Sequence, residues 1–186
     1  MNRSHIALLS AVIALSGLPL AAEVCATRAD LVEGIVVSYA HGGSDLFTAD
    51  PRRPGVIRLD AEIEGHRLGT VEFAQGHVYL SAIGPQGQRV RYDYDMLPAD
   101  IPPPFPGSDW EAVAVVTADG ASSTDRQRVQ GGLGGTLTLG ECIWELVEVT
   151  ITWSTGEETR YYFPELGLSV PAGDQVTAIT PLALVP

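Results

Sequence analysis

Short segments in which apolar and polar residues alternate recur along most of the chain. Residues 56–64 (VIRLDAEIE) and 89–94 (RVRYDY) are typical, and turns rich in glycine or proline separate such segments. A period of two places successive side chains on opposite faces of an extended chain, so each segment suits a half-buried strand. Connections of hairpin length favour antiparallel pairing. The pattern predicts an all-β domain of about ten mostly antiparallel strands.

Many successive strands have the spacing to pair with their neighbours, so we expect a curved meander or a partly open barrel, with a β-sandwich as the alternative. Only residues 26–33 have the pattern of a helical turn, with Thr27 as its cap. Residues 97–109 contain five prolines and predict a stiff connection or a covering loop, not a strand within the sheet. Residues 118–135 are polar and rich in glycine, and we expect them to be mobile.

The N-terminus has the three-part order of a secretory signal. Arg3 supplies a positive charge, residues 6–18 are mostly apolar, and small residues end the segment at Ala22. The apolar run is short for a membrane span, which needs about 20 residues. We therefore expect a signal peptide at residues 1–22 and one all-β domain at residues 23–186, without a transmembrane segment. Export predicts a periplasmic location, or secretion as the alternative.

Charge and cysteine content narrow the class of protein further. The formal net charge is −12, and the chain contains no lysine. Such acidity argues against nucleic acid as a partner, because phosphates would be repelled. The two cysteines, Cys25 and Cys142, predict one disulfide in an exported protein. Two buried free thiols are the alternative.

Several blocks of the sequence look like part of a known group of proteins. The blocks are residues 25–34, 74–79 (AQGHVY), 137–142 (LTLGEC) and 162–168 (YFPELGL). The chain is similar in these blocks to uncharacterised small exported proteins, which bear signal peptides, in alphaproteobacteria of the Rhodobacter group. The resemblance implies an exported location and a shared architecture. It implies no activity and no catalytic residues.

No motif for catalysis or for a cofactor stands out. The chain has no G-x-S-x-G sequence and no locally paired histidine or cysteine ligands, so we predict no catalytic, cofactor-binding or metal-ligating residues. Asp93 and Asp95 would share one strand face and are the candidate acid–base pair if the protein is an enzyme. His41, His66 and His77 would have to join them, but their positions are typical of exposed turns and a strand surface.

Aromatic residues gather on the expected strands. Tyr161, Tyr162 and Phe163 are consecutive, so aromatic side chains lie on both faces of their strand. At least one of them must meet a second layer, a ligand or a partner. We therefore take these three residues and Trp153 as the candidate ligand or partner surface.

Three functions follow from these features. The first is a non-catalytic periplasmic β-scaffold that binds an apolar small molecule or an envelope protein. The second is a periplasmic hydrolase that uses carboxylates and a histidine. The third is a structural subunit of the cell envelope, in which the glycine-rich segment 131–135 or the proline-rich segment 102–106 becomes ordered on assembly.

Overall fold

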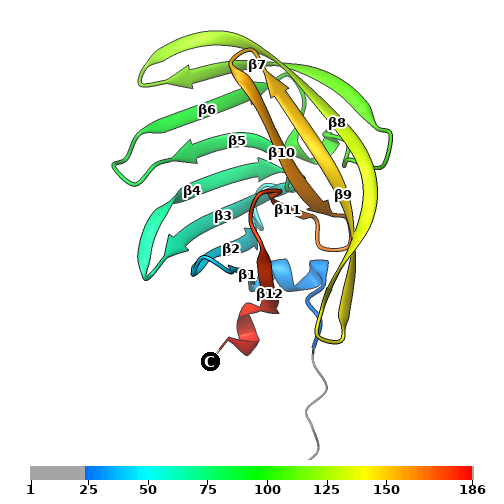
Figure 1. Ribbon diagram of the computed structural model, residues 1–186. Coiled ribbons are helices and arrows are strands. Elements are labelled where there is room, and N and C mark those ends of the chain that lie inside the picture. The colour runs from blue at the N-terminus through cyan, green and yellow to red at the C-terminus, as the bar shows by residue number, and fades with distance from the viewer. Residues whose placement is uncertain (1–23, 186) are drawn as a thin grey trace, which may run out of the picture.

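A computed structural model describes residues 24–185, whose twelve strands form one antiparallel sheet (Figure 1). The strands are β1 (Ile35–Tyr39), β2 (Gly43–Ala49), β3 (Val56–Ile63), β4 (His66–Ala74), β5 (Val78–Ile83), β6 (Arg89–Tyr94), β7 (Asp109–Ala118), β8 (Ala121–Leu139), β9 (Cys142–Trp153), β10 (Gly156–Phe163), β11 (Leu168–Pro171) and β12 (Val176–Pro181). The short 3₁₀ helices are η1 (Arg28–Val32), η2 (Pro98–Asp100) and η3 (Leu182–Leu184). The expected signal peptide, residues 1–22, lies outside the described residues.

Strands β1 to β10 each pair with the next strand along the chain, and β12 pairs with β1. The sheet therefore stays open, with β11 and β12 as its edges. The sequence-based prediction of an all-β fold built as a curved antiparallel meander is confirmed, with twelve strands where about ten were expected. Figure 1 shows the sheet curling, so that β9 and β10 pass across the face of the earlier strands.

Two apolar clusters fill the curled sheet. The first joins β1 to β4 with β10, β11, η1 and the start of β9, and Phe47, Phe73 and Phe163 are among its buried members. The second joins the β4–β5 turn region to β8, β9 and β10, and Ile101 closes it from the proline-rich segment. Ile101 is 1% exposed, so residues 97–109 form the covering segment that the prolines predicted.

Strand β10 is buried on both faces, which accounts for its consecutive aromatic residues. Tyr162 belongs to the second cluster, whereas Phe163 belongs to the first. The β10–β11 edge is thus an inner layer of the molecule. It packs against the β4–β5 turn so closely that a Cβ atom on Gly76 would lie 2.1 Å from the carbonyl oxygen of Gly167. Only glycine permits this approach, and Gly76 also has a positive φ of 74°.

The expectation of a mobile segment at residues 118–135 was wrong, because most of it belongs to β8, the longest strand. Asp125 and Gln127 occupy its inward positions, so the strand shows no apolar alternation. Its glycines lie where the proline-rich segment crosses it. Gly107 donates its N–H to the carbonyl oxygen of Gly131 at 2.8 Å, and Gly131 donates to Ser108 at 2.8 Å. These bonds fix a segment whose composition suggested disorder.

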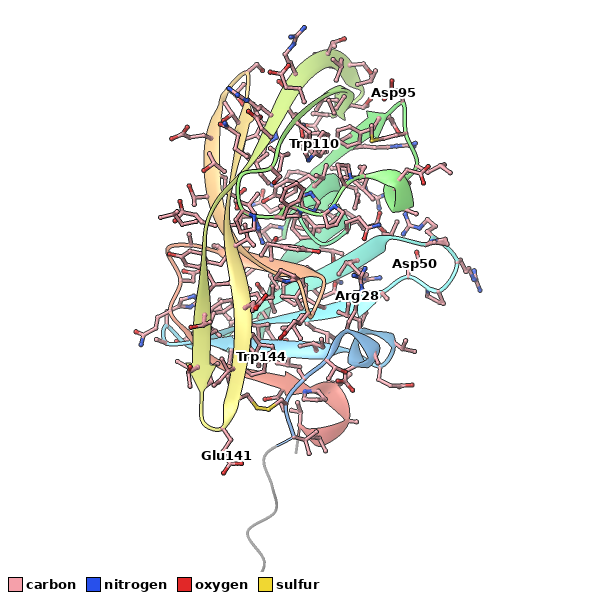
Figure 2. The ribbon with its side chains drawn as sticks, turned by 90° about the vertical axis from the view of Figure 1, so that its right-hand side faces the viewer. Arg28, Asp50, Asp95, Trp110, Glu141 and Trp144 are labelled. Carbon is pink, nitrogen blue, oxygen red and sulfur yellow. A yellow bond between two sulfur atoms is a disulfide. The ribbon has the colours of Figure 1, made fainter. Side chains whose placement is uncertain are left out.

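The predicted disulfide between Cys25 and Cys142 is present, and it ties the segment before η1 to the start of β9. Figure 2 shows it as a yellow bond close to Trp144. The indole of Trp144 donates to the carbonyl oxygen of Ala26 at 3.1 Å. The expected helical turn after Thr27 is also present as η1, and the carboxylate of Asp30 accepts the N–H of Thr27 at 2.7 Å. Together these contacts anchor the described N-terminal residues to the core.

Candidate functional site

A groove of about 760 Å³ lies between the proline-rich segment and strands β8, β9 and β10. Its walls are mostly apolar. They include Pro103, Phe105, Pro106, Leu146, Val147 and Tyr162. Arg28 of η1 contributes to the rim, and Figure 2 views this side of the molecule with Arg28 labelled. We call this feature the apolar groove.

The apolar groove is the uncovered continuation of the second cluster. Val147, Val149 and Ile151 share one face of β9 and are buried in that cluster. By strand alternation, Glu145 and Ile143 lie on the same face. Both are exposed, and Ile143 is 65% exposed. This face of β9 is therefore uncovered beyond Val147.

Glycines in β8 leave room for the apolar groove. Gly134 lines it opposite Val147, just after an irregularity in the pairing of β8 with β9. A Cβ atom on Gly134 would lie 3.4 Å from Cγ of Pro106, which is ordinary contact, and Gly134 is not among the residues with a positive φ. The groove is thus a space that a larger side chain at this position would fill without backbone strain.

Few charges enter the apolar groove. Glu145 and Arg28 are its charged lining residues, and Arg28 donates a hydrogen bond to Oε1 of Gln75 at 3.3 Å. Burial raises the pKa of Tyr162, while the positive charge of Arg28 acts in the opposite direction. The Tyr162 phenol is therefore neutral at physiological pH, and the floor of the groove carries no charge.

The four aromatic residues singled out from the sequence fall in different places. Tyr162 lines the apolar groove, and Trp153 lines a separate pocket beside Tyr79. Tyr161 and Phe163 pack with the first cluster, and Phe163 is fully buried. The structure therefore does not bring the four into one surface, and their part in binding stays a prediction.

The structure does not bring together the candidate acid–base pair. Asp93 lies on β6 and accepts a hydrogen bond from Nε of Arg91 at 2.8 Å. Asp95 follows the end of that strand, and the two carboxylates line different surface pockets. Their shared strand face, which suggested paired chemistry, ends at Tyr94. No histidine lines either of these pockets within the described chain.

The three histidines of the described chain are dispersed. His41 lies 3.7 Å from Asp174, but its Nδ1 accepts the N–H of Gly43 at 3.2 Å. His66 is exposed at the start of β4. The expectation of a surface position for His77 was wrong, because the β10–β11 edge covers it completely.

A buried polar network inside the curled sheet escaped the sequence analysis. Arg160 is 3% exposed, and its Nη1 donates to Glu158 at 2.6 Å and to the hydroxyl of Tyr79 at 3.2 Å. Its Nε and Nη2 donate to the hydroxyl and carbonyl oxygens of Ser169, both at 2.9 Å. The feature of the sequence that could have indicated this network is an arginine at an inward-facing position of a strand rich in aromatic residues. Its partners lie up to 81 residues away, so the sequence could not identify them.

Asp45 is a second buried group that the sequence did not reveal. It accepts a hydrogen bond of 2.6 Å from the hydroxyl of Tyr39. Burial raises the pKa of Asp45, while the hydrogen bond from Tyr39 and the charge of Arg160 act to lower it. The carboxyl and the phenol satisfy each other beside the first cluster, an arrangement that stabilises the fold.

None of the helices in residues 24–185 has the length and apolar character to cross a membrane. No group of three or more histidine, cysteine, aspartate or glutamate side chains in the same range is arranged to hold a metal ion. Comparison of the chain with protein-family models, with curated proteins and with solved structures gave no significant match.

Proposed function

We propose that the protein is a non-catalytic binding protein that holds an apolar small molecule in the apolar groove. The observation that carries this proposal is the groove itself, with its volume of about 760 Å³ and its mostly apolar walls. Small-molecule sites are typically concave and apolar, with volumes of roughly 300–1,000 Å³. The groove has the size and the chemistry of such a site.

The walls of the apolar groove support the proposal because they are already in place. Pro103, Pro104 and Pro106 restrict the backbone of one wall, and paired strands form the other. A ligand that enters a preformed site loses less free energy to ordering the protein than one that must organise a loop. Binding at this site therefore requires little rearrangement.

We place the function in the periplasm, with secretion as the alternative. The signal-like pattern of residues 1–22 supports export. The Cys25–Cys142 disulfide agrees with it, since such bonds persist in oxidising compartments. A carrier or receptor for a poorly soluble molecule suits this location.

A protein partner is the second candidate occupant of the same region. Phe105, on the groove wall, is 62% exposed, and Ile143 on the adjoining face of β9 is 65% exposed. Large exposed apolar side chains at the edge of a groove are typical of protein interfaces. An apolar side chain of a partner would then occupy the groove in place of a free ligand.

The test uses the neutral fluorescent probe N-phenyl-1-naphthylamine and the Gly134→Phe variant. We expect the wild-type protein to enhance the probe's fluorescence with saturation, because the dye enters an apolar site. The phenyl ring of the variant fills the groove, so the affinity should fall at least about tenfold, equivalent to about 1.4 kcal/mol. Native mass spectrometry of protein purified gently from its host would then identify any natural ligand.

Gly132→Phe is the matched control, because Gly132 lies on the same strand but near Glu148, outside the groove. It should bind the probe as the wild type does. Equal binding by Gly134→Phe and the wild type would contradict the proposal. Three results together would favour the protein partner. The wild-type protein would not bind the probe, no ligand would co-purify with it, and it would form a stable complex with another protein that Gly134→Phe disrupts.

A further inference from the structure

A second pocket, of about 290 Å³, lies within the curl of the sheet, where β5 and β6 face the β9–β10 turn. Three aromatic side chains, Tyr79, Tyr92 and Trp153, contribute to its walls. The ring centroids of Tyr79 and Trp153 are 5.8 Å apart, and those of Tyr79 and Tyr92 are 6.2 Å apart. The rings therefore form one contiguous aromatic wall, and we call this feature the aromatic pocket.

Two carboxylates, those of Asp125 and Glu158, line the aromatic pocket. Asp125 is only 8% exposed, and its partners are neutral: it accepts the N–H of Ser154 at 3.0 Å and a weaker contact from Nε2 of Gln127 at 3.4 Å. No basic side chain in residues 24–185 forms an ion pair with it. A buried carboxylate without a cationic partner is unusual, because desolvation penalises the charge.

Arg160 contacts two residues that line the aromatic pocket, and its donors are already engaged. Arg160 donates to Glu158, Tyr79 and Ser169, and it lies over the ring of Phe73 at 5.0 Å from the centroid. It does not line the pocket, and no lysine, arginine or histidine of the described chain does. The two carboxylates therefore give the pocket a net negative charge after Arg160 neutralises one of them.

The pKa of Tyr92 is consistent with a net negative charge in the aromatic pocket. Burial raises the pKa of its phenol, and the charges of Asp125 and Glu158 raise it further. The pocket thus combines negative potential with electron-rich ring faces.

We propose that the aromatic pocket binds a small organic cation, a protonated or quaternary amine. Aromatic faces attract such cations through their quadrupole, and desolvation strengthens the attraction. The bound cation supplies the positive charge that Asp125 lacks within the protein, and the net charge of −12 draws cations towards the molecule. This site is separate from the apolar groove, and it does not depend on the function proposed there.

The test compares choline with its uncharged isostere 3,3-dimethyl-1-butanol by isothermal titration calorimetry on the mature protein. The two molecules have the same shape, so the difference in their affinities measures recognition of the positive charge. We expect choline to bind at least about tenfold more tightly than the alcohol. Equal affinities of choline and the alcohol would overturn the proposal. So would the absence of choline binding at concentrations up to about 10 mM.

Two lysine substitutions locate the binding. Ser123 lines the aromatic pocket, whereas Ser122, the residue before it on β8, lies on the opposite face beside the Thr117 hydroxyl. Ser123→Lys should abolish choline binding by placing a cation in the pocket, and Ser122→Lys should leave it unchanged although the net charge is the same. Equal binding by both variants would overturn the assignment.

Asp125→Asn provides an independent readout that preserves the shape of the side chain. We expect choline to bind at least about tenfold more weakly to this variant, while the alcohol binds as it does to the wild type. Circular dichroism confirms that each variant is folded before titration. A neutral sugar such as glucose that binds where choline does not would replace the cation assignment with a carbohydrate one.

Discussion

At the scale of single residues, His77 shows how burial sets a charge state. Its side chain is completely buried, and its Nδ1 lies 3.2 Å from the carbonyl oxygen of Gln75. Its Nε2 has no partner among the described residues, and the ring meets Tyr162 edge to face. Burial lowers the pKa of His77 to about 4; the Gln75 hydrogen bond opposes this shift, and the charge of Arg160 adds to it.

The pKa of His77 predicts loss of stability in mild acid. Between about pH 6.5 and pH 4 the unfolded chain binds a proton at this residue and the folded chain does not. The free energy of unfolding should therefore fall as the pH drops through this window, by up to about 3 kcal/mol from His77. Urea unfolding at pH 7, 5.5 and 4 measures this slope.

The His77→Asn variant isolates the contribution of the imidazole. Asparagine keeps a donor near the position of Nδ1 but does not titrate, so the variant should lose about 3 kcal/mol less than the wild type between pH 7 and pH 4. The raised pKa of Asp45 contributes with the opposite sign, and both proteins share it. Parallel pH profiles for the two proteins would show that His77 is not the cause.

The residue scale is also where sequence reasoning was least complete. His77, Arg160 and Asp125 each follow local patterns that are typical of exposed positions. The contacts that bury His77 and Arg160 join the β4–β5 region to the β10–β11 edge, more than 70 residues away along the chain. Asp125 meets the β9–β10 turn, where its partner Ser154 is 29 residues away. No local period contains this information, so the polar network and the aromatic pocket could be found only from the structure.

At the scale of elements, β8 and the proline-rich segment depend on each other. The segment carries Ile101 into the second cluster and forms one wall of the apolar groove. Its backbone passes so close to β8 that a Cβ atom on Gly131 would lie 2.1 Å from the carbonyl oxygen of Phe105. The prolines correctly predicted a stiff connection or a covering loop outside the sheet, and the structure shows the covering loop. The glycines were not read correctly, because loop composition and close strand packing both favour glycine.

The Gly131→Ala substitution should weaken the contact between β8 and the proline-rich segment. The added methyl group forces Phe105 away and weakens the hydrogen bonds that join Gly131 to Gly107 and Ser108. Overpacking of this kind lowers the free energy of unfolding by about 1–3 kcal/mol. Urea denaturation measures this change, and the probe used for the apolar groove should report weaker binding because one wall moves.

Gly132→Ala is the matched control for the element prediction. The nearest atom to a Cβ on Gly132 is the carbonyl oxygen of Glu148 at 3.4 Å, and Gly132 is not among the residues with a positive φ. The substitution should change stability by no more than about 1 kcal/mol, since it reduces the entropy of the unfolded chain without strain. If both variants are equally stable, the close contact at Phe105 does not constrain the segment.

At the scale of the whole molecule, alternation and turn spacing were sufficient to predict the architecture. They predicted the all-β class, antiparallel pairing and the meander, because each of these follows from neighbouring segments. They did not reveal that the sheet curls until β10 and β11 become an inner layer. This arrangement arises from packing between segments far apart in sequence, and it creates the two apolar clusters and both pockets.

The disulfide is the cross-link with the greatest effect at this scale. Cys25 and Cys142 are 117 residues apart, and the bridge joins the start of the domain to β9. In the chain-entropy account, closing a loop of this length stabilises the fold by about 5 kcal/mol. The Cys25→Ala, Cys142→Ala double variant should therefore lose about 4–5 kcal/mol in the free energy of unfolding.

Reductant provides the control for the disulfide prediction. Dithiothreitol should destabilise the wild-type protein by a similar amount and should leave the double variant unchanged. A loss of less than about 1 kcal/mol in the double variant would mean that the unfolded chain is already compact at this loop.

The position of β12 has a consequence for the order in which the chain acquires structure. Every other strand pair joins neighbours along the chain, but Val37 of β1 pairs with Ile179 of β12. Ten hairpin-like pairings can form between neighbouring strands while the outer edge of β1 remains open. That edge is a vacant template for strand pairing until β12 covers it. The sheet therefore gains its final edge through its one long-range strand pairing among the described residues.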